Sequence, residues 1–360
     1  MRPANAIDFW RGFALVTIFI NHVPGIWYET FTHKNVSISD SAELFVFLAG
    51  WSLRLIVEGR SRPPIGQIVY RLYGRAFTLY CAHLLIVCIA IASLAVAAIV
   101  LQNPLILEWH NAAHVFYDPV RTHVGLVFLT HQLGYFDILP LYIVLMLWAP
   151  ILAIMDRFLP GVVLPFAFGL YVLVLSTSLP MPTWPTNNNW FFNPLAWQLV
   201  FTLGFVLGGK NTVAGRFARR NIAIIRALAL PIVIGGAIVA FNKWWPDPTA
   251  MPDPKLLFIW HKTYLTPIRL IQFLALVAVM SAAFPYIVGA VPTVVEFLSM
   301  LGRNSLHVFC LGSVLSLWAQ IIRYVFHGYL LVDTVIILMG LVLMAAIAWV
   351  VEWKAGVQKA

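Results

Sequence analysis

The sequence contains little charge and little cysteine. Only 10% of its 360 residues are Asp, Glu, Lys or Arg, whereas roughly a quarter are charged in an ordinary soluble domain. Hydrophobic residues make up 61% of the chain, and the mean hydropathy is +0.86. This composition excludes an ordinary soluble protein. Cys81, Cys88 and Cys310 all lie in apolar stretches without a disulfide partner in a hydrophilic loop, so we expect buried, unreactive thiols.

Long apolar stretches account for most of the chain. A bilayer crossing needs about 20 apolar residues in a helix. The sequence therefore predicts an all-α membrane bundle of about ten transmembrane helices, forming a single domain over residues 1–360 with no room for a separate soluble domain. The ten stretches are 7–25, 43–58, 76–101, 138–155, 161–179, 195–209, 222–241, 264–284, 304–322 and 332–351.

The net charge of +9 is distributed as in a membrane protein and not as in a nucleic-acid-binding protein. The basic residues cluster in alternate loops, which the positive-inside rule assigns to the cytoplasm. With ten crossings, both termini are then expected to be cytoplasmic, and no nucleic-acid partner is expected. The clustered residues include Arg71, Arg75, Lys210, Arg216, Arg219 and Arg220.

Three polar residues interrupt the first apolar stretch: Asp8, Arg11 and His22. Arg11 and His22 are eleven residues apart, so they share a helix face at a separation of about 16 Å along the axis. Charged groups inside a membrane usually pair or line a cavity. One interpretation is that Asp8 pairs with Arg11 near the membrane surface. For His22 we favour a general base, because a neutral imidazole suits that role near neutral pH.

Asp40 and Glu43 are candidates to orient His22, since they begin the second stretch at a similar expected depth. Their spacing is also that of a capping box, in which both carboxylates satisfy free amide groups at a helix start. The two roles are compatible, and the sequence leaves both open.

The sequence leaves two interpretations open for the roles of four basic residues. Arg71 and Arg75 lie one turn apart, which suits either a cytoplasmic membrane anchor or a clamp for the phosphates of a nucleotide-bearing donor. Arg269, with Lys262 at the outer end of its stretch, requires a carboxylate, which either the protein or an anionic substrate would supply.

Histidines and tryptophans of the outer loops have spacings and side chains that could bind a metal or a sugar. His110 and His114 have a spacing that suits a metal, but no additional ligand follows at a characteristic distance, so no metal site is predicted. The tryptophans of the outer loops indicate an interfacial aromatic belt. The alternative is a surface on which sugar rings stack.

Several segments of the chain together resemble the OpgC branch of the acyltransferase type 3 superfamily of integral membrane proteins. The similarity extends over nearly the whole length. The matching segments are residues 8–15 with His22, 39–51, 135–142, 192–199, 262–263 with 267–270, and 301–306.

The resemblance implies an O-acyltransferase of the bacterial inner membrane that succinylates periplasmic glucans. It implies no tightly bound cofactor, and a cytosolic acyl-CoA, here succinyl-CoA, as co-substrate. His22 would be the base or a transient acyl carrier, and Arg11 would line the donor tunnel. We expect Arg71 and Arg75 to bind donor phosphates, Lys262 and Arg269 to bind the succinyl carboxylate, and Asn304 or a backbone amide to stabilise the oxyanion.

Two other classes of function fit parts of the sequence. A secondary transporter of a small anionic solute would explain the intramembrane Asp, Arg and His residues. However, these residues concentrate in the first two stretches and do not recur in two halves of the chain. A membrane scaffold without enzymatic activity leaves the buried charges without a purpose.

Overall fold

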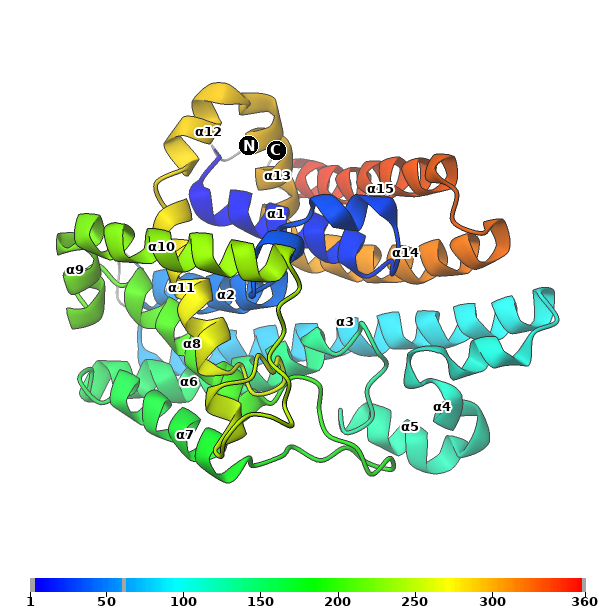
Figure 1. Ribbon diagram of the computed structural model, residues 1–360, viewed down its shortest axis with the longest axis horizontal. Coiled ribbons are helices and arrows are strands. Elements are labelled where there is room, and N and C mark those ends of the chain that lie inside the picture. The colour runs from blue at the N-terminus through cyan, green and yellow to red at the C-terminus, as the bar shows by residue number, and fades with distance from the viewer. Residues whose placement is uncertain (1–3, 60–62, 358–360) are drawn as a thin grey trace.

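The computed structural model describes residues 4–59 and 63–357, and its regular structure is helical throughout those residues. Figure 1 shows the arrangement. The α-helices are α1 (Ala6–Asn21), α2 (Ser41–Val57), α3 (Ile65–Val100), α4 (Ala113–Tyr117), α5 (Pro119–Val127), α6 (Ile138–Phe158), α7 (Val163–Thr177), α8 (Pro194–Gly208), α9 (Val213–Arg220), α10 (Ile222–Phe241), α11 (Pro267–Met280), α12 (Phe284–Ala290), α13 (Pro292–Arg303), α14 (Ser305–Phe326) and α15 (Leu330–Val357). Short 3-10 helices are η1 (Trp27–Phe31), η2 (His33–Val36), η3 (Pro104–Asn111) and η4 (Lys255–Leu257).

Every predicted apolar stretch coincides with a helix, but the count of ten membrane crossings is not confirmed. Within the described residues, five helices are long and apolar enough to cross a membrane: α3, α6, α10, α14 and α15. A sixth span results if α11 and α12, which are bent by 52° to each other, act together. The apolar helices α7 and α8 are shorter. Helix α1, with 16 residues, is about 24 Å long, less than the roughly 30 Å hydrocarbon layer. The structure thus supports a multi-pass membrane protein.

Glycines allow two pairs of helices to pack backbone against backbone. Between α1 and α13, a methyl group at Gly12 would lie 1.9 Å from the carbonyl oxygen of Leu298, and one at Gly302 would lie 1.8 Å from that of Asp8. Between α2 and α8, Gly50 and Gly204 allow a similarly close approach. Small residues are the usual means of close helix packing in membranes. These two contacts hold α1 and α2, which contain the polar residues of interest, inside the bundle.

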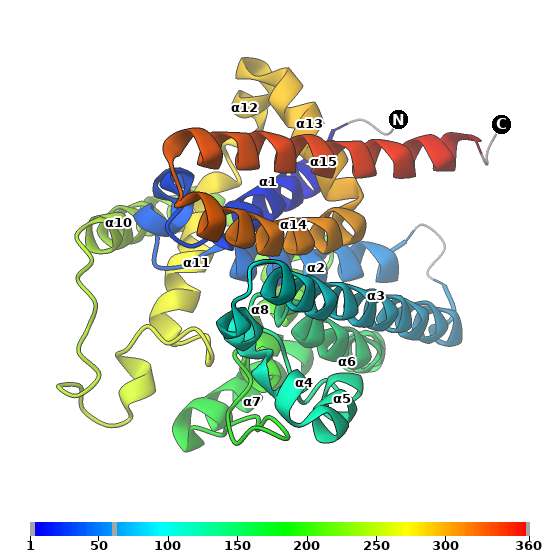
Figure 2. The same cartoon turned by 90° about the vertical axis from the view of Figure 1, so that its right-hand side faces the viewer.

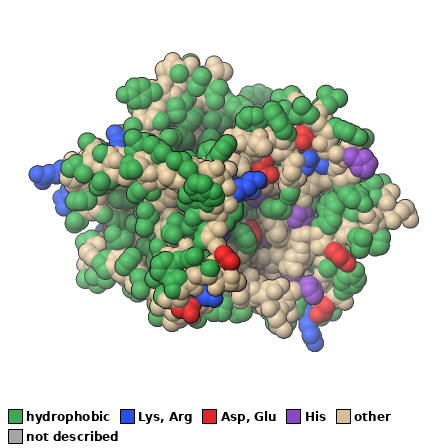
Figure 3. All heavy atoms as spheres, in the orientation of Figure 1, with side chains coloured by type: hydrophobic (Ala, Val, Ile, Leu, Met, Phe, Trp, Pro, Cys, Tyr) green, Lys and Arg blue, Asp and Glu red, His purple; other side chains and the backbone are tan. Residues whose placement is uncertain are grey.

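The start of α1 and the end of α15 lie at the same end of the molecule. Gly302, near the end of α13, contacts Asp8, and the neighbouring Arg303 forms an ion pair with Glu352 of α15 at 2.7 Å. Figure 2 shows the start of α1 and the end of α15 pointing toward the same side. Basic side chains also gather at the end of the molecule where α9 lies, on the left of Figure 3.

Several helices present apolar side chains outward, as expected of surfaces that contact lipid. Only 11% of the most apolar part of α10 and 28% of that of α15 are buried inside the protein. Cys81 and Cys88 lie on such outward-facing parts of α3 and are exposed, so the prediction that they are buried is wrong. An apolar sequence does not distinguish a residue that faces lipid from one that faces the protein core. All three cysteines are free thiols.

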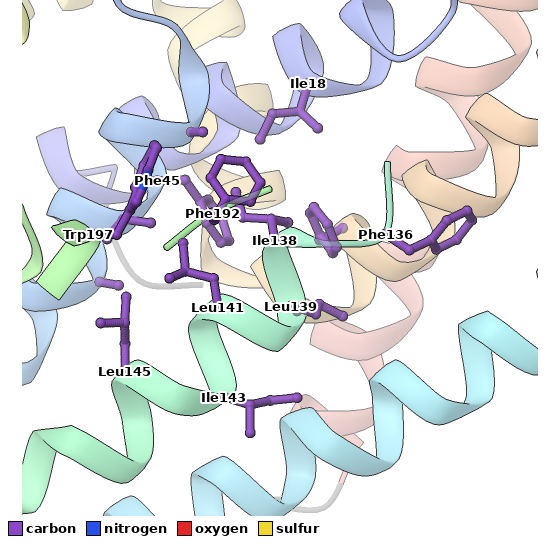
Figure 4. Packing of buried hydrophobic residues seen from close by; sticks show 14 of the residues in the cluster. Ile18, Phe45, Phe136, Ile138, Leu139, Leu141, Ile143, Leu145, Phe192 and Trp197 are labelled. Atoms are coloured by element: carbon purple, nitrogen blue, oxygen red, sulfur yellow. The ribbon is translucent and has the colours of Figure 1, made fainter. Parts of the chain in front are cut away.

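Aromatic residues from three elements pack beneath the N-terminal end of α2. Phe45 of α2 stacks on Phe309 of α14 at 5.9 Å, and Phe192 packs edge-on against Trp197 of α8 at 4.8 Å. Figure 4 shows Phe45, Phe192 and Trp197 together with the first residues of α6. This rigid layer supports the polar groups described next.

Candidate functional site

His22 ends α1 and is held in place through its backbone. Its amide donates to the carbonyl of Ile18 at 3.0 Å, and its carbonyl accepts a hydrogen bond from Nε2 of Gln320 at 2.6 Å. Arg323, one turn further along α14, donates to the carbonyls of Pro24 and Gly25 in the turn that follows. Helix α14 thus fixes the position of His22 and of the turn beside it.

The His22 ring packs against Tyr135. The Nδ1 atom of His22 is buried without a hydrogen-bond partner in the described part of the chain. The two ring centroids are 4.8 Å apart. On Tyr135 a second imidazole, that of His110, packs at 5.3 Å.

Tyr135 and His110 belong to the wall of an open cavity of about 690 Å³ at the C-terminal end of α1. Aromatic rings and hydrogen-bonding groups alternate around it. The lining residues are Pro24, Trp109, His110, Tyr135, Gln320, Arg323, Tyr324, His327 and Gly328.

Asp40 and Glu43 form the capping box that their spacing indicated. Asp40 accepts from the amide of Ala42 at 2.8 Å, and Glu43 Oε2 accepts from the amide of Asp40 at 3.1 Å. Both carboxylates also pair with cations. Lys262 donates to Asp40 Oδ2 at 2.5 Å, and Arg269 Nε donates to Glu43 Oε1 at 2.9 Å. These four side chains form one charge cluster that joins the start of α2 to the start of α11.

Arg269 pairs with a carboxylate of the protein, which is one of the two interpretations that the sequence left open. Glu43 has no exposed surface, and the Arg269 side chain is 8% exposed. Lys262 is more open at 27%, and its ammonium also faces the rings of Phe191 and Phe192 at 5.6 and 5.4 Å. Lys262 is therefore the more accessible of the two cations.

Two members of the charge cluster act electrostatically on His22: Lys262 opposes a positive charge on the imidazole, and Asp40, the smaller of the two effects, favours it. No hydrogen bond joins Asp40 to His22 in the described structure. Burial alone would raise the pKa of Asp40, but Lys262 and Arg269 hold that pKa well below its ordinary range. Asp40 therefore stays ionised. Glu43 is committed to Arg269 and to the amide of Asp40, so Asp40 is the better placed of the two predicted partners of His22.

Arg11 binds α2 at some distance from His22. Its guanidinium donates to the carbonyl of Leu48 at 3.2 Å and to the hydroxyl of Ser52, and it lies 4.0 Å from Asp8. Asp8 in turn accepts from the side chain of Asn5 at 2.6 Å. The expected proximity of Asp8 and Arg11 is therefore present at the beginning of α1.

An apolar groove of about 310 Å³ runs between α1, α2 and α11. Ala6 and Ile7 line it at the start of α1, and Asp40 and His33 line it near the start of α2. Trp10, Phe47, Trp51 and Phe273 are among the apolar residues between these ends. Ser281, at the same end as Ala6, accepts a hydrogen bond from Arg226 of α10 at 3.0 Å. The groove thus connects the beginning of α1 with the Asp40 carboxylate.

Three of the predicted site residues lie elsewhere. Arg71 and Arg75 are exposed on α3, which contributes no residue to the groove lining. Asn304 donates to Glu352 at 3.1 Å and to the carbonyl of Met300 at 2.9 Å. It follows the contact between Gly302 and Asp8, so it lies at the opposite end of α1 from His22. The structure does not bring these three together with His22.

Sequence reasoning missed several residues around His22. Tyr135 packs on the His22 ring and Gln320 donates to the His22 carbonyl, and the sequence predicted neither as a site residue. Asp137 lies two residues beyond Tyr135. Burial raises the pKa of Asp137 to about 6, against the opposing effect of Lys262. Burial also lowers the pKa of His33. Because these residues come from loops and helices far apart in the chain, no local spacing could have associated them.

No group of three or more His, Cys, Asp or Glu side chains that could hold a metal occurs in residues 4–59 and 63–357. His110 and His114 do not share a helix face, because the backbone of His110 interrupts η3. His114 packs instead near His131, with their rings 6.1 Å apart.

Comparison with known proteins agrees with the resemblance noted in the sequence. No curated protein and no solved structure matches the chain. The family model described as "OpgC protein" matches residues 4–356, nearly the whole chain. Because this match covers nearly all of the sequence, the chain belongs to the OpgC protein family.

Proposed function

We propose that this protein is a membrane-embedded O-acyltransferase that transfers a succinyl group from cytosolic succinyl-CoA to a hydroxyl of a periplasmic glucan. Membership of the OpgC family implies a role in glucan succinylation. The donor, the mechanism and the site residues are part of the proposal.

One observation carries the proposal: His22 packs on the wall of a cavity at the C-terminal end of α1, and a separate groove runs from the start of α1 to Asp40. Asp40 lines the groove that begins at Ala6, and His22 packs on Tyr135 of the cavity at the other end of α1. A donor and an acceptor that reside on opposite sides of a membrane require such an arrangement. The two hollows support an acyl donor in the groove and a sugar in the cavity.

The proposed reaction is a direct transfer. His22 removes the proton of the acceptor hydroxyl as its oxygen attacks the thioester carbonyl. The new C–O bond forms, the C–S bond breaks, and the leaving thiolate takes the proton from the imidazolium. Asp40, kept ionised by Lys262, stabilises the positive charge that develops on His22. A transient acyl group on His22 would require the same residues.

On the donor side, the apolar groove suits the uncharged arm of acyl-CoA. Arg226 bonds Ser281, which lines the groove, and Arg11 bonds Ser52 of α2. Both are candidates to bind the donor phosphates, together with Arg71 and Arg75. We place the succinyl carboxylate near Lys262, because its ammonium is accessible whereas Arg269 is enclosed with Glu43.

The proposed orientation follows from the distribution of basic residues. Arg216, Arg219 and Arg220 of α9 lie at one end of the molecule, which we assign to the cytoplasm. The cavity next to His22 then faces the periplasm, and the protein resides in the bacterial inner membrane with both termini in the cytoplasm. A reporter fused after Val357 should be active in the cytoplasm only; periplasmic activity would reverse this orientation.

The decisive experiment compares His22→Ala with His123→Ala in transfer of labelled succinyl from succinyl-CoA to periplasmic glucan by the purified protein. His123 is an exposed histidine of α5 whose ring bonds the carbonyl of Pro119, so it is a matched control. His22→Ala should abolish transfer and retain the parental elution profile in detergent, whereas His123→Ala should keep full activity. Near-normal transfer by His22→Ala would refute the mechanism. A protein without any acyl-CoA turnover that moves an anionic solute across vesicles would instead be a transporter.

A further inference from the structure

Two residues of the cavity wall next to His22 adopt an uncommon backbone conformation. Tyr135 has a φ of 65° and His110 has a φ of 56°, both in the left-handed region. Residues other than glycine are uncommon there, and such strained positions cluster at functional sites. Here the two strained residues also face each other, with ring centroids 5.3 Å apart.

Specific hydrogen bonds keep these two loops in register. The amide of Gly134 donates to the carbonyl of His110 at 2.8 Å, and the side chain of Asn111 donates to the carbonyl of Gln132 at 3.1 Å. His131, which is fully buried, bonds the carbonyl of Asn111 at 3.1 Å through Nε2. The strain is therefore maintained by contacts on both sides of the His110 ring, and the result is a fixed position for that imidazole.

The His110 imidazole has an unused polar atom. Its Nε2 is buried and forms no hydrogen bond in the described structure, although Gln320 lies near enough to interact with the ring. The ring lines the cavity. A polar atom that is buried without a partner is unfavourable by itself. A ligand that enters the cavity and offers a hydroxyl would satisfy it.

The remaining walls favour a neutral sugar. Trp109 and Tyr324 pack at nearly right angles, with centroids 5.6 Å apart, and both line the cavity together with Tyr135. Pyranose rings stack on the faces of such aromatic rings. Gln320 and Arg323 also line the cavity, with donors engaged by the backbone of residues 22–25 and by Asp333, and none of the lining residues is acidic. This lining suits a polyhydroxylated ligand and offers no carboxylate to a cation.

We propose that His110 binds a hydroxyl of the glucose unit that is acylated and thereby positions that unit against His22. This inference rests on the proposed function. His22 and His110 pack on the same Tyr135 ring and lie near enough for His110 to act electrostatically on His22. One sugar stacked in the cavity therefore presents one hydroxyl to His110 and another to His22. His110 is a binding residue for the acceptor and takes no proton in the transfer.

The test measures acceptor and donor kinetics separately for the full-length protein in detergent. The acceptor is periplasmic glucan from cells that lack this protein, and the donor is succinyl-CoA. His110→Ala should raise the acceptor KM about tenfold, the expected effect of one lost hydrogen bond to a buried group. The donor KM should not change. His110→Gln, which keeps a hydrogen-bonding group, should recover part of the loss.

Two controls separate this inference from other outcomes. Trp109 lies in the cavity, so glucan binding without donor should change the tryptophan fluorescence of the parent and of His22→Ala. In His110→Gln the change should saturate at a higher glucan concentration than in the parent, by less than the roughly tenfold expected for His110→Ala. This titration decides the matter if His110→Ala does not fold. A parental acceptor KM in His110→Ala, or a fall in kcat with unchanged KM, would overturn the role of His110. Transfer by His22→Ala would overturn the proposed function instead.

Discussion

Replacing Arg269 should destabilise the protein strongly, because its partner would remain buried and unpaired. Glu43 has no exposed surface, and the Arg269 side chain is 8% exposed. With Arg269 Nε 2.9 Å from Glu43 Oε1, the attraction is about 6 kcal/mol for an effective dielectric constant of roughly 20. Desolvation of both groups offsets most of this gain. Removing one partner of a buried pair nevertheless costs about 3–5 kcal/mol, since the other charge stays enclosed.

The expectation can be measured with a double-mutant cycle. Arg269→Met should lower the free energy of unfolding in detergent by about 3–5 kcal/mol. Adding Glu43→Gln removes the unpaired charge and keeps the hydrogen bond to the amide of Asp40, so the double variant should recover at least about 2 kcal/mol. Arg121→Met is the matched control: this pair with Asp118 is 4.0 Å apart and its side chains are 71% and 42% exposed, so the change should stay below about 1 kcal/mol.

The same variant discriminates between the structural role of Arg269 and a role in substrate binding. If Arg269→Met unfolds like the parent but loses its preference for succinyl-CoA over acetyl-CoA, then the guanidinium serves the substrate. In that case the reasoning from burial and pairing is refuted. Loss of stability together with recovery in the double variant would establish the pair with Glu43.

Three further predictions concern other parts of the structure. Gly204→Ala should lower the free energy of unfolding by about 1–3 kcal/mol, because its methyl group would lie 2.0 Å from a carbonyl oxygen of α2. Gly235→Ala, which has open space around it, should leave the free energy of unfolding unchanged. Equal effects of the two substitutions would contradict the close helix packing. Because burial raises the pKa of Asp137 from 3.8 to about 6, the folded protein binds this proton more tightly than the unfolded chain, so stability should fall as the pH rises from 3.8 toward 6. Unfolding temperatures of Asp137→Asn should lack this decline, and an unchanged pH profile would refute the assignment. Arg226→Gln should raise the KM for succinyl-CoA without affecting the acceptor KM. Steady-state kinetics of Arg71→Gln, measured alongside, show which of the two cations binds the donor. An unchanged donor KM in Arg226→Gln would exclude binding of the donor phosphates beside Ser281.

Local features of the site were predictable because they depend on residues close in sequence. Asp40 and Glu43 cap α2 since a carboxylate at a helix start satisfies amide groups only a few bonds away. Asp8 lies near Arg11 because residues three apart share a helix face. The carboxylate partner of Arg269 was foreseen as a type of group, but nothing in the sequence identified it as Glu43, which is 226 residues away.

The sequence by itself determined the helical membrane character, the positions of the apolar stretches, the polar stripe that ends at His22 and the family. These properties depend on composition, on helix periodicity and on motifs read along the chain. Only the tertiary structure decided which apolar faces point outward, as at Cys81 and Cys88, and which distant segments meet at the cavity, where His110, Tyr135 and Gln320 surround His22. The physical reason is that apolar side chains are stabilised both by lipid and by the protein interior. Hydropathy therefore predicts where helices lie in the sequence but not which other helices they contact. Contacts between helices arise from shape, as at the glycines of α1 and α2, and that shape exists only after the chain has folded.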